Sequence, residues 1–263
     1  SYPNDRWDGS LSYLEIGPGF DPALGFVRRT GIRTVSGLIR RKHRPGGSGW
    51  YRQLAGGADV SVTSRTSGGL DSARFGVAPF NLEFASTDEL SLRISHNIDR
   101  PAEAFELGDI TVPAGEYSWT KARLEFEATS SRPVWGEFSV EAGEFYDGWR
   151  VQGSAEVEWN PSRHFRINGT YQYNRVDLGD GSFDAHVGSL GINWNLTPDL
   201  GWSTLVQYDS LSNEVGFNSR IRWEYRPGST IYLVLNQSLM AEDRGLDLQR
   251  SDLTLKADAT FRF

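Results

Sequence analysis

Hydrophobic and polar residues alternate along much of this chain with a period of two. The clearest run is residues 149–159, where Trp, Val, Gly, Ala, Val and Trp fill one set of alternate positions and Arg, Gln, Ser, Glu and Glu fill the other. Successive side chains of a β-strand point to opposite faces of the sheet, so this run predicts a strand with one apolar and one polar face.

The same alternation recurs at residues 122–128, 165–173, 217–226 and 252–263. No long segment shows the 3.6-residue period of an amphipathic helix. The pattern predicts about fourteen strands, with approximate spans 7–16, 32–42, 56–66, 72–85, 89–99, 115–128, 134–145, 148–160, 163–175, 183–196, 200–210, 214–226, 229–239 and 251–263.

The length of these runs favours a membrane barrel over a soluble β-sandwich or solenoid. Sandwich strands average ~5–6 residues, whereas many runs here span 11–14. Trp149 and Trp159 bracket one apolar face, and at ~3.3 Å per residue they match the ~25 Å apolar band, with an aromatic girdle at each edge, of an outer-membrane barrel. We therefore expect an all-β, antiparallel transmembrane β-barrel of the bacterial outer membrane, as a single domain over residues 1–263.

The predicted connections fall into two classes. Counted back from the C-terminus, every second one is short and rich in turn residues, as in periplasmic turns: 227–228, 196–199, 160–162, 130–133 and 86–88. The intervening connections are longer, as in extracellular loops: 240–250, 175–182, 100–114 and 17–31. One long connection, 43–55, falls on the turn side and breaks the rule.

Composition is compatible with this architecture. The mean hydropathy of −0.46 resembles that of a soluble protein, but a polar inner face lowers the average of a barrel in the same way. The formal net charge of −7 argues against a nucleic-acid partner. The absence of cysteine excludes a disulfide framework and thiolate chemistry.

Charged residues of both signs occupy the polar positions of the predicted strands. They are interpreted as a cross-strand ion-pair network around a water-filled lumen or as a charged constriction that filters small solutes. The predicted lumen-lining residues are Arg123, Glu125, Glu127, Glu137, Glu141, Arg150, Glu156, Glu158, Arg166, Arg220, Arg222, Glu224, Lys256, Asp258 and Arg262. The predicted aromatic girdle comprises Trp149, Trp159, Tyr171, Tyr173, Trp202, Trp223, Tyr225 and Phe261, and the terminal Phe263 resembles a barrel-insertion signal.

Motifs for catalysis are missing. The four histidines, at 43, 96, 164 and 186, lack metal-ligand spacing, and there is no nucleophile elbow or phosphate-binding loop. Paired carboxylates of a glycosidase need a spacing and a raised pKa that sequence does not reveal. We expect no enzyme activity, cofactor or metal.

The densest basic stretch is interpreted either as a solvated loop with part of the lumen face, or as a contact for anionic lipid headgroups or an acidic partner. It comprises Arg28, Arg29, Arg33, Arg40, Arg41, Lys42, His43 and Arg44.

Five segments carry a family resemblance. They are 20–29 (FDPALGFVRR), 112–117 (VPAGEY), 173–178 (YNRVDL), 205–210 (LVQYDS) and 218–228 (NSRIRWEYRPG), of which the last is the most specific. In this order they resemble the C-terminal part of a large, functionally uncharacterised outer-membrane barrel family, whose members typically carry an N-terminal domain similar to family-nine carbohydrate-binding modules.

The resemblance implies that the chain lacks that module and the upstream barrel strands. The sugar-binding function of the module is not carried over, because no residues here match it. The barrel then either closes at fourteen strands or is the C-terminal part of a larger one.

Three functions follow as hypotheses. The first is a channel or channel-like scaffold with a charged lumen for small solutes. The second is a structural barrel that anchors a larger cell-surface complex through its long loops. The third is a soluble carbohydrate-binding β-protein. The expected partners are outer-membrane lipid and other envelope or surface proteins.

Overall fold

The computed structural model describes residues 2–22, 29–47, 49–242 and 245–260. These residues form strands, turns and irregular segments, and none of them forms a helix long and apolar enough to cross a membrane. The strands are β1 (Tyr2–Pro3), β2 (Trp7–Ile16), β3 (Ile32–His43), β4 (Tyr51–Arg65), β5 (Leu70–Phe84), β6 (Glu89–Asp99), β7 (Phe105–Leu107), β8 (Ile110–Val112), β9 (Tyr117–Glu127), β10 (Val134–Phe145), β11 (Gly148–Ser162), β12 (Phe165–Leu178), β13 (Gly181–Asn195), β14 (Leu200–Asp209), β15 (Glu214–Arg226), β16 (Ser229–Glu242) and β17 (Gly245–Asp258).

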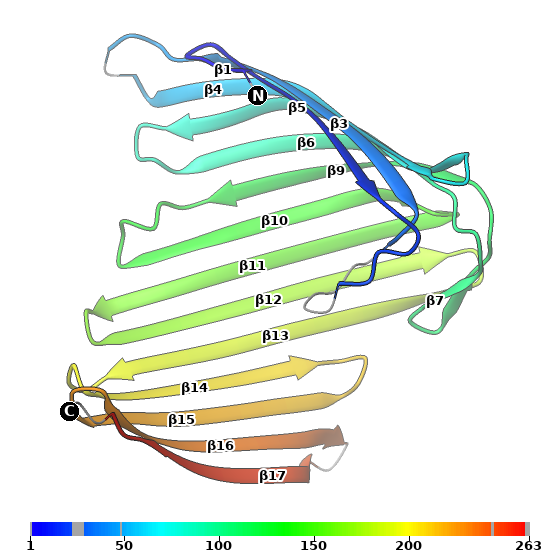
Figure 1. Cartoon of the computed structure of the whole chain (residues 1–263). Helices are drawn as coiled ribbons and strands as arrows, with labels where there is room; N and C mark the ends of the chain where they lie inside the picture. The colour runs from blue at the N-terminus through cyan, green and yellow to red at the C-terminus, as the bar shows by residue number, and fades with distance from the viewer. Residues whose placement is uncertain (1, 23–28, 48, 243–244, 261–263) are drawn as a thin grey trace. The chain divides into compact units, whose positions relative to one another are not determined.

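Fifteen of the strands form one antiparallel sheet that follows the order of the chain, with β9 next to β6 (Figure 1). The order is β1-β2-β3-β4-β5-β6-β9-β10-β11-β12-β13-β14-β15-β16-β17, and β7 and β8 form a separate two-stranded hairpin. Apart from the two-residue β1, the large sheet contains fourteen strands of 10 to 15 residues. The expected all-β antiparallel class and the number of strands are confirmed.

The sheet is open in the described part of the chain. Its hydrogen-bonded order begins with β1 and β2 and ends with β17, without a pairing between these ends. Of the two forms expected, the ring closed at fourteen strands is therefore not observed.

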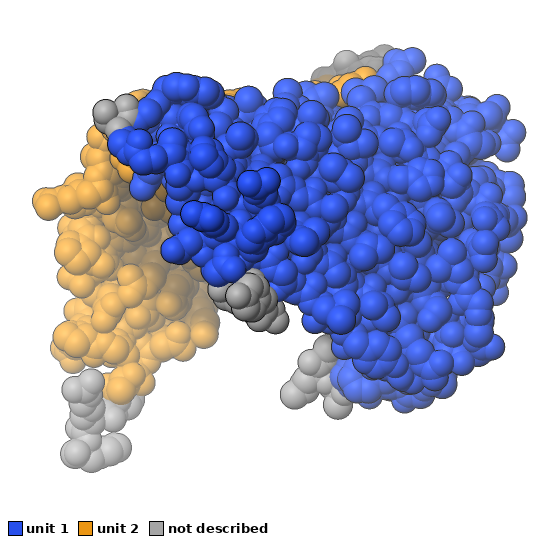
Figure 2. All heavy atoms as spheres, turned by 90° about the horizontal axis from the view of Figure 1, so that it is seen from above, with its two compact units in different colours: residues 1–127, 139–152, 175–183 blue, residues 128–138, 153–174, 184–263 orange. Residues whose placement is uncertain are grey.

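Two compact units divide the chain (Figure 2). Unit 1 contains residues 1–127, 139–152 and 175–183, and unit 2 contains residues 128–138, 153–174 and 184–263. Each unit is described by itself below.

In unit 1, register places side chains of the same kind next to one another. Val35 has Tyr13 and Val62 as its Cα partners on either side, and Ser36 has Ser61 as its partner on β4. We call the face that carries Val35 the apolar face of unit 1 and the opposite one, which carries Ser36, the polar face. The hydroxyls of Ser36 and Ser61 lie 3.1 Å apart on that polar face.

Unit 2 shows the same division. Leu233 has Ile221 and Leu255 as its Cα partners on the apolar face, whereas Arg222 has Tyr232 as its partner on the polar face. A one-residue slip would exchange the two faces, so the alternation read from the sequence specifies the register.

The antiparallel order places successive connections at alternate edges of the sheet. The turn edge carries the connections 44–50, 85–88, 128–133, 163–164, 196–199 and 227–228. The loop edge carries the connections 17–31, 66–69, 100–116, 146–147, 179–180, 210–213 and 243–244.

Two predicted loops at the loop edge are strands instead. β12 ends at Leu178 and β13 begins at Gly181, so 175–182 is not a long loop. β16 and β17 likewise extend through most of 240–250, with Met240 paired to Asp247. Backbone N–H and C=O groups continue the ladder whatever side chains they carry, so pairing outlasts the apolar alternation on which the prediction rested.

Candidate functional site

Oppositely charged side chains gather on the polar face of unit 1. The Asp59 carboxylate accepts a hydrogen bond from Arg93 and lies 3.5 Å from the Arg74 guanidinium, and its side chain is only 13% exposed. Lys121 donates to Glu141 at 2.8 Å across from β9 to β10. Because most of this charge is compensated by a neighbour, the face is strongly polar without a large excess of one sign.

Several ion pairs join residues two positions apart on one strand. Arg123 and Glu125 lie 2.6 Å apart in unit 1. In unit 2 the same spacing brings together Arg222 with Glu224 at 2.6 Å, Arg250 with Asp252 at 2.6 Å and Lys256 with Asp258 at 3.3 Å. Residues i and i+2 of a strand share a face, which makes such pairs independent of the neighbouring strand.

Glu158 has three partners on the polar face of unit 2. It accepts hydrogen bonds from Trp135 Nε1 at 3.2 Å and Asn160 Nδ2 at 2.7 Å, and it lies 3.6 Å from Arg166. Glu137 and Glu156 line a nearby recess of about 230 Å³.

The other residues predicted to line a lumen are placed as follows. Glu127 lies opposite Glu89, Arg150 donates to Gln152 at 2.5 Å, and Arg220 lines a recess of about 440 Å³ with Lys256 and Asp258. Arg262 lies outside the described residues. In the described ranges, no group of three or more His, Asp and Glu side chains is arranged to hold a metal ion.

The apolar faces are exposed in both units. Leu11 is 79% exposed in unit 1, and Leu253 and Leu255 are 70% and 71% exposed in unit 2. Other exposed residues of these faces are Tyr13, Val35, Ile39, Phe75, Val77, Ile94, Leu124, Phe126, Leu190, Ile221 and Leu233. Soluble monomers rarely expose contiguous apolar surface of this extent.

Most of the predicted aromatic girdle belongs to the exposed surface. Trp149, Trp159, Tyr171, Trp223 and Tyr225 are exposed. Trp202 donates to Ser219 at 2.9 Å, and Tyr173 donates to Asp184 at 2.5 Å. Phe261 and Phe263 lie outside the described residues.

A buried apolar cluster lies at the loop edge of unit 1, where the β7–β8 hairpin packs against the sheet. Ile110 and Val112 of the hairpin are 6% and 3% exposed and pack with Val176 and Leu178 of β12. Tyr117 and Phe145 join the rim of the cluster. Tyr117, whose Cα partner is Asp99, lies an even number of residues from Arg123 on β9, so both side chains are on the polar face. The hairpin therefore packs on the polar face.

Aromatic rings hold the hairpin in place. Tyr146 lies in the two-residue turn between β10 and β11, and its ring centroid is 5.6 Å from Phe105, 5.1 Å from Tyr117 and 4.8 Å from Trp119. Its backbone has a left-handed φ of 51°, which is uncommon for a residue other than glycine. The contacts with Phe105 and Tyr117 are edge-on, and such contacts stabilise a cluster beyond simple burial.

The Tyr146 hydroxyl is a partly buried polar group of this cluster. It donates to Asp99 Oδ2 at 2.9 Å. Burial, followed by the hydrogen bond to Asp99, raises the pKa of Tyr146 above its ordinary value. The hydroxyl therefore stays protonated and serves as a donor.

The sequence contained a signal for this hairpin that the strand pattern obscured. Gly108 and Asp109 form a two-residue turn between apolar residues, which is a typical hairpin signature. Gly108 has φ of 61°, and a Cβ there would approach the Phe183 ring to 3.2 Å. The strands on either side have only three residues, too short to show a clear period of two.

Comparisons with known proteins give one structural similarity. No family model and no curated protein matches the chain. Among solved structures, the FrpB iron transporter from Neisseria meningitidis (F5-1 variant, apoprotein form) is similar, with a TM-score of 0.40 and 13% sequence identity. The similarity covers 89% of this chain and 57% of that chain, so this chain spans little more than half of the transporter's length.

Proposed function

We propose that this chain forms a β-barrel in the bacterial outer membrane, with its apolar faces toward lipid and its polar faces lining a passage for small polar solutes. The observation that carries the proposal is the opposite character of the two faces in each unit. Exposed Leu, Val, Ile and aromatic side chains fill one face, and compensated charges fill the other. Lipid on the outer side of a barrel suits the apolar face, and water in its interior suits the charged face.

The β7–β8 hairpin supports a gated or narrowed passage. It packs on the polar face at the loop edge, against Tyr117 and Phe145. A segment folded onto the inner face of a barrel reduces the space through which solutes pass. In the proposed barrel, the hairpin sets the cross-section and the paired charges set the preference for ions.

Reconstitution tests this function. The chain, unfolded in urea, is diluted into phospholipid vesicles, and folding is followed by the shift of the unheated band in gel electrophoresis. The folded protein is then added to planar bilayers. We expect detergent- or lipid-dependent folding and discrete conductance steps. A chain that stays monomeric in buffer without detergent would contradict the membrane assignment and favour a soluble carbohydrate-binding protein.

A structural barrel that anchors a larger surface complex is the second candidate. The buried contact between the hairpin and the polar face favours it, because a fixed segment could fill the interior. Folded protein without conductance would support this candidate over an open passage. Affinity purification from native outer membranes should then recover surface proteins in fixed ratio, whereas recovery of the barrel alone would count against it.

A further inference from the structure

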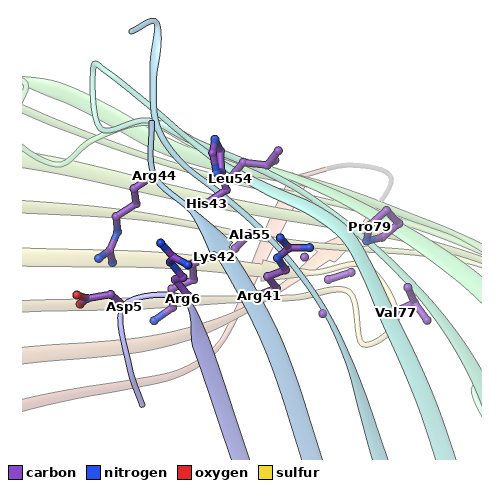
Figure 3. Close-up of a pocket in the computed structure, with 13 residues that line it drawn as sticks. Asp5, Arg6, Arg41, Lys42, His43, Arg44, Leu54, Ala55, Val77 and Pro79 are labelled. Atoms are coloured by element: carbon purple, nitrogen blue, oxygen red, sulfur yellow. The ribbon is translucent and has the colours of Figure 1, made fainter. Parts of the chain in front are cut away.

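The basic stretch of the sequence divides into residues with different partners. Arg29 lies 2.5 Å from Asp71, and Arg33 lies 3.2 Å from Glu15, both near the loop edge. Arg40 faces the polar side, opposite Gly57. Arg28 lies outside the described residues. The other members lie at the turn edge, where Arg41, Lys42, His43 and Arg44 line a cavity of about 1070 Å³ together with Arg6 (Figure 3).

Three guanidinium groups in this cavity lack a carboxylate partner. Within the described part of the chain, no Asp or Glu lies within ion-pair distance of Arg6, Arg41 or Arg44. Arg44 Nε donates to Gln53 at 3.0 Å, which leaves its charge uncompensated. Lys42 differs, because Asp8 lies 2.6 Å away. Asp5 is the one carboxylate among the lining residues, so positive charge predominates.

The same cavity has an apolar side. Leu54 and Val77 line it, and both are exposed on the apolar face of unit 1. Register puts Arg41 on this face opposite Trp7, and the Arg41 guanidinium carbon lies 5.8 Å from the centre of the Trp7 ring. The cavity therefore joins unpaired cations to the apolar surface proposed to contact lipid.

Aromatic residues mark this end of the strands as a membrane interface. Trp50, in the connection 44–50, is 66% exposed and packs against Tyr51 and Phe84 with ring centroids 4.9 and 6.1 Å away. Trp and Tyr concentrate at the headgroup level of a bilayer. Phosphates of lipid headgroups would thus lie at the height of the three arginines.

We propose that this cavity binds the phosphate of an anionic phospholipid, with its acyl chains along Leu54 and Val77. The assignment rests on the proposed membrane barrel. Guanidinium groups bind phosphate oxygens through paired hydrogen bonds. A free phosphate ion would use the arginines alone, whereas a lipid also uses the apolar side of the cavity. This combination of lining residues therefore favours the lipid.

Native mass spectrometry of the whole chain tests the proposal. The protein is refolded in mixed vesicles of phosphatidylglycerol and phosphatidylcholine, released in mild detergent, and its bound lipids are counted. The test variant carries Arg6→Gln, Arg41→Gln and Arg44→Gln. The matched control carries Arg132→Gln, Arg163→Gln and Arg226→Gln, which remove the same charge in or directly before other turns of the turn edge. Inorganic phosphate is added as a competitor in a separate arm.

We expect the wild-type chain and the control to retain phosphatidylglycerol in preference to phosphatidylcholine. Each arginine removed from the cavity should weaken this preference about fivefold, so that the triple variant loses it. Equal retention of both lipids by the wild type, or equal losses in both variants, would overturn the site. Displacement by millimolar phosphate would assign the cavity to the free ion instead. The gel shift separates these results from a failure to insert, which would overturn the barrel itself.

Discussion

Several polar side chains in the described part of this protein have a specific partner on the same face of the sheet. Asp59 pairs with two arginines on the polar face, and Glu158 accepts hydrogen bonds from a tryptophan and an asparagine. An unpaired buried group would cost more than any of these contacts contributes. Tyr146 is a further example, because its ring packs among other aromatic rings and its hydroxyl has Asp99 as its acceptor.

Tyr146 should make hairpin stability depend on pH. Its pKa is raised above the ordinary value of 10.0 by burial and by its bond to Asp99. The folded chain therefore keeps a proton that the unfolded chain releases above about pH 10, so stability declines as the pH rises through that value. Tyr146→Phe should lower the free energy of unfolding by about 1 kcal/mol at neutral pH.

Tyr146→Phe should also remove the contribution of this hydroxyl to the loss of stability at alkaline pH. Urea unfolding in vesicles at about pH 7 and about pH 11 measures both effects. Tyr225→Phe is the control, because Tyr225 is exposed. An alkaline decline of the same size in the Tyr146→Phe chain would refute the role assigned to this hydroxyl.

Among the elements, the β7–β8 hairpin is the main one that strand periodicity did not predict. The long strands were predictable, since runs such as 149–159 have an apolar or small residue at every second position and a polar one between. The hairpin is too short for that, and its contacts with Val176 and Leu178 join segments more than sixty residues apart. Those two residues also belong to a predicted loop. Neither the hairpin nor the part of β12 that it contacts was therefore predicted as a strand.

Truncation of the hairpin's buried side chain should release it without unfolding the sheet. Ile110→Ala removes a 6% exposed residue from the cluster, and we expect the docking to weaken by about 2–4 kcal/mol. Limited proteolysis should then cut within 100–116, and conductance should rise. Val140→Ala, on an exposed side chain, is the matched control. Unchanged proteolysis and conductance in Ile110→Ala would show that the hairpin does not narrow the passage.

At the scale of the whole molecule, the sequence predicts two-sided strands but not how the sheet ends. Alternation defines the apolar and polar positions of each strand, and the register of β2 to β9 agrees with it. Closure depends on which strands meet at the two edges, a long-range pairing that local periodicity does not encode. The charged residues could be assigned to a face, whereas partners on a neighbouring strand, such as Glu141 for Lys121, depended on strand register.

A charge placed on the apolar face should block membrane folding. Ile94 lies midway along β6, between Val77 and Ala122. Ile94→Arg should destabilise the protein in vesicles by about 2–4 kcal/mol, as charges at the lipid-facing midplane do. Ser91→Arg is the control, because Ser91 faces the polar side beside Glu125. Equal folding efficiencies for both variants would argue against lipid on the apolar face.

The ion pairs between residues two positions apart bear on how the protein assembles. Arg222 with Glu224 and Lys256 with Asp258 neutralise each other within a single strand. In the proposed barrel, such a strand brings its own counter-charge into the bilayer, where an uncompensated charge is costly. β15 and β17 of the proposed barrel can therefore enter with these four side chains already paired, before the strand that will lie beside each of them has been added.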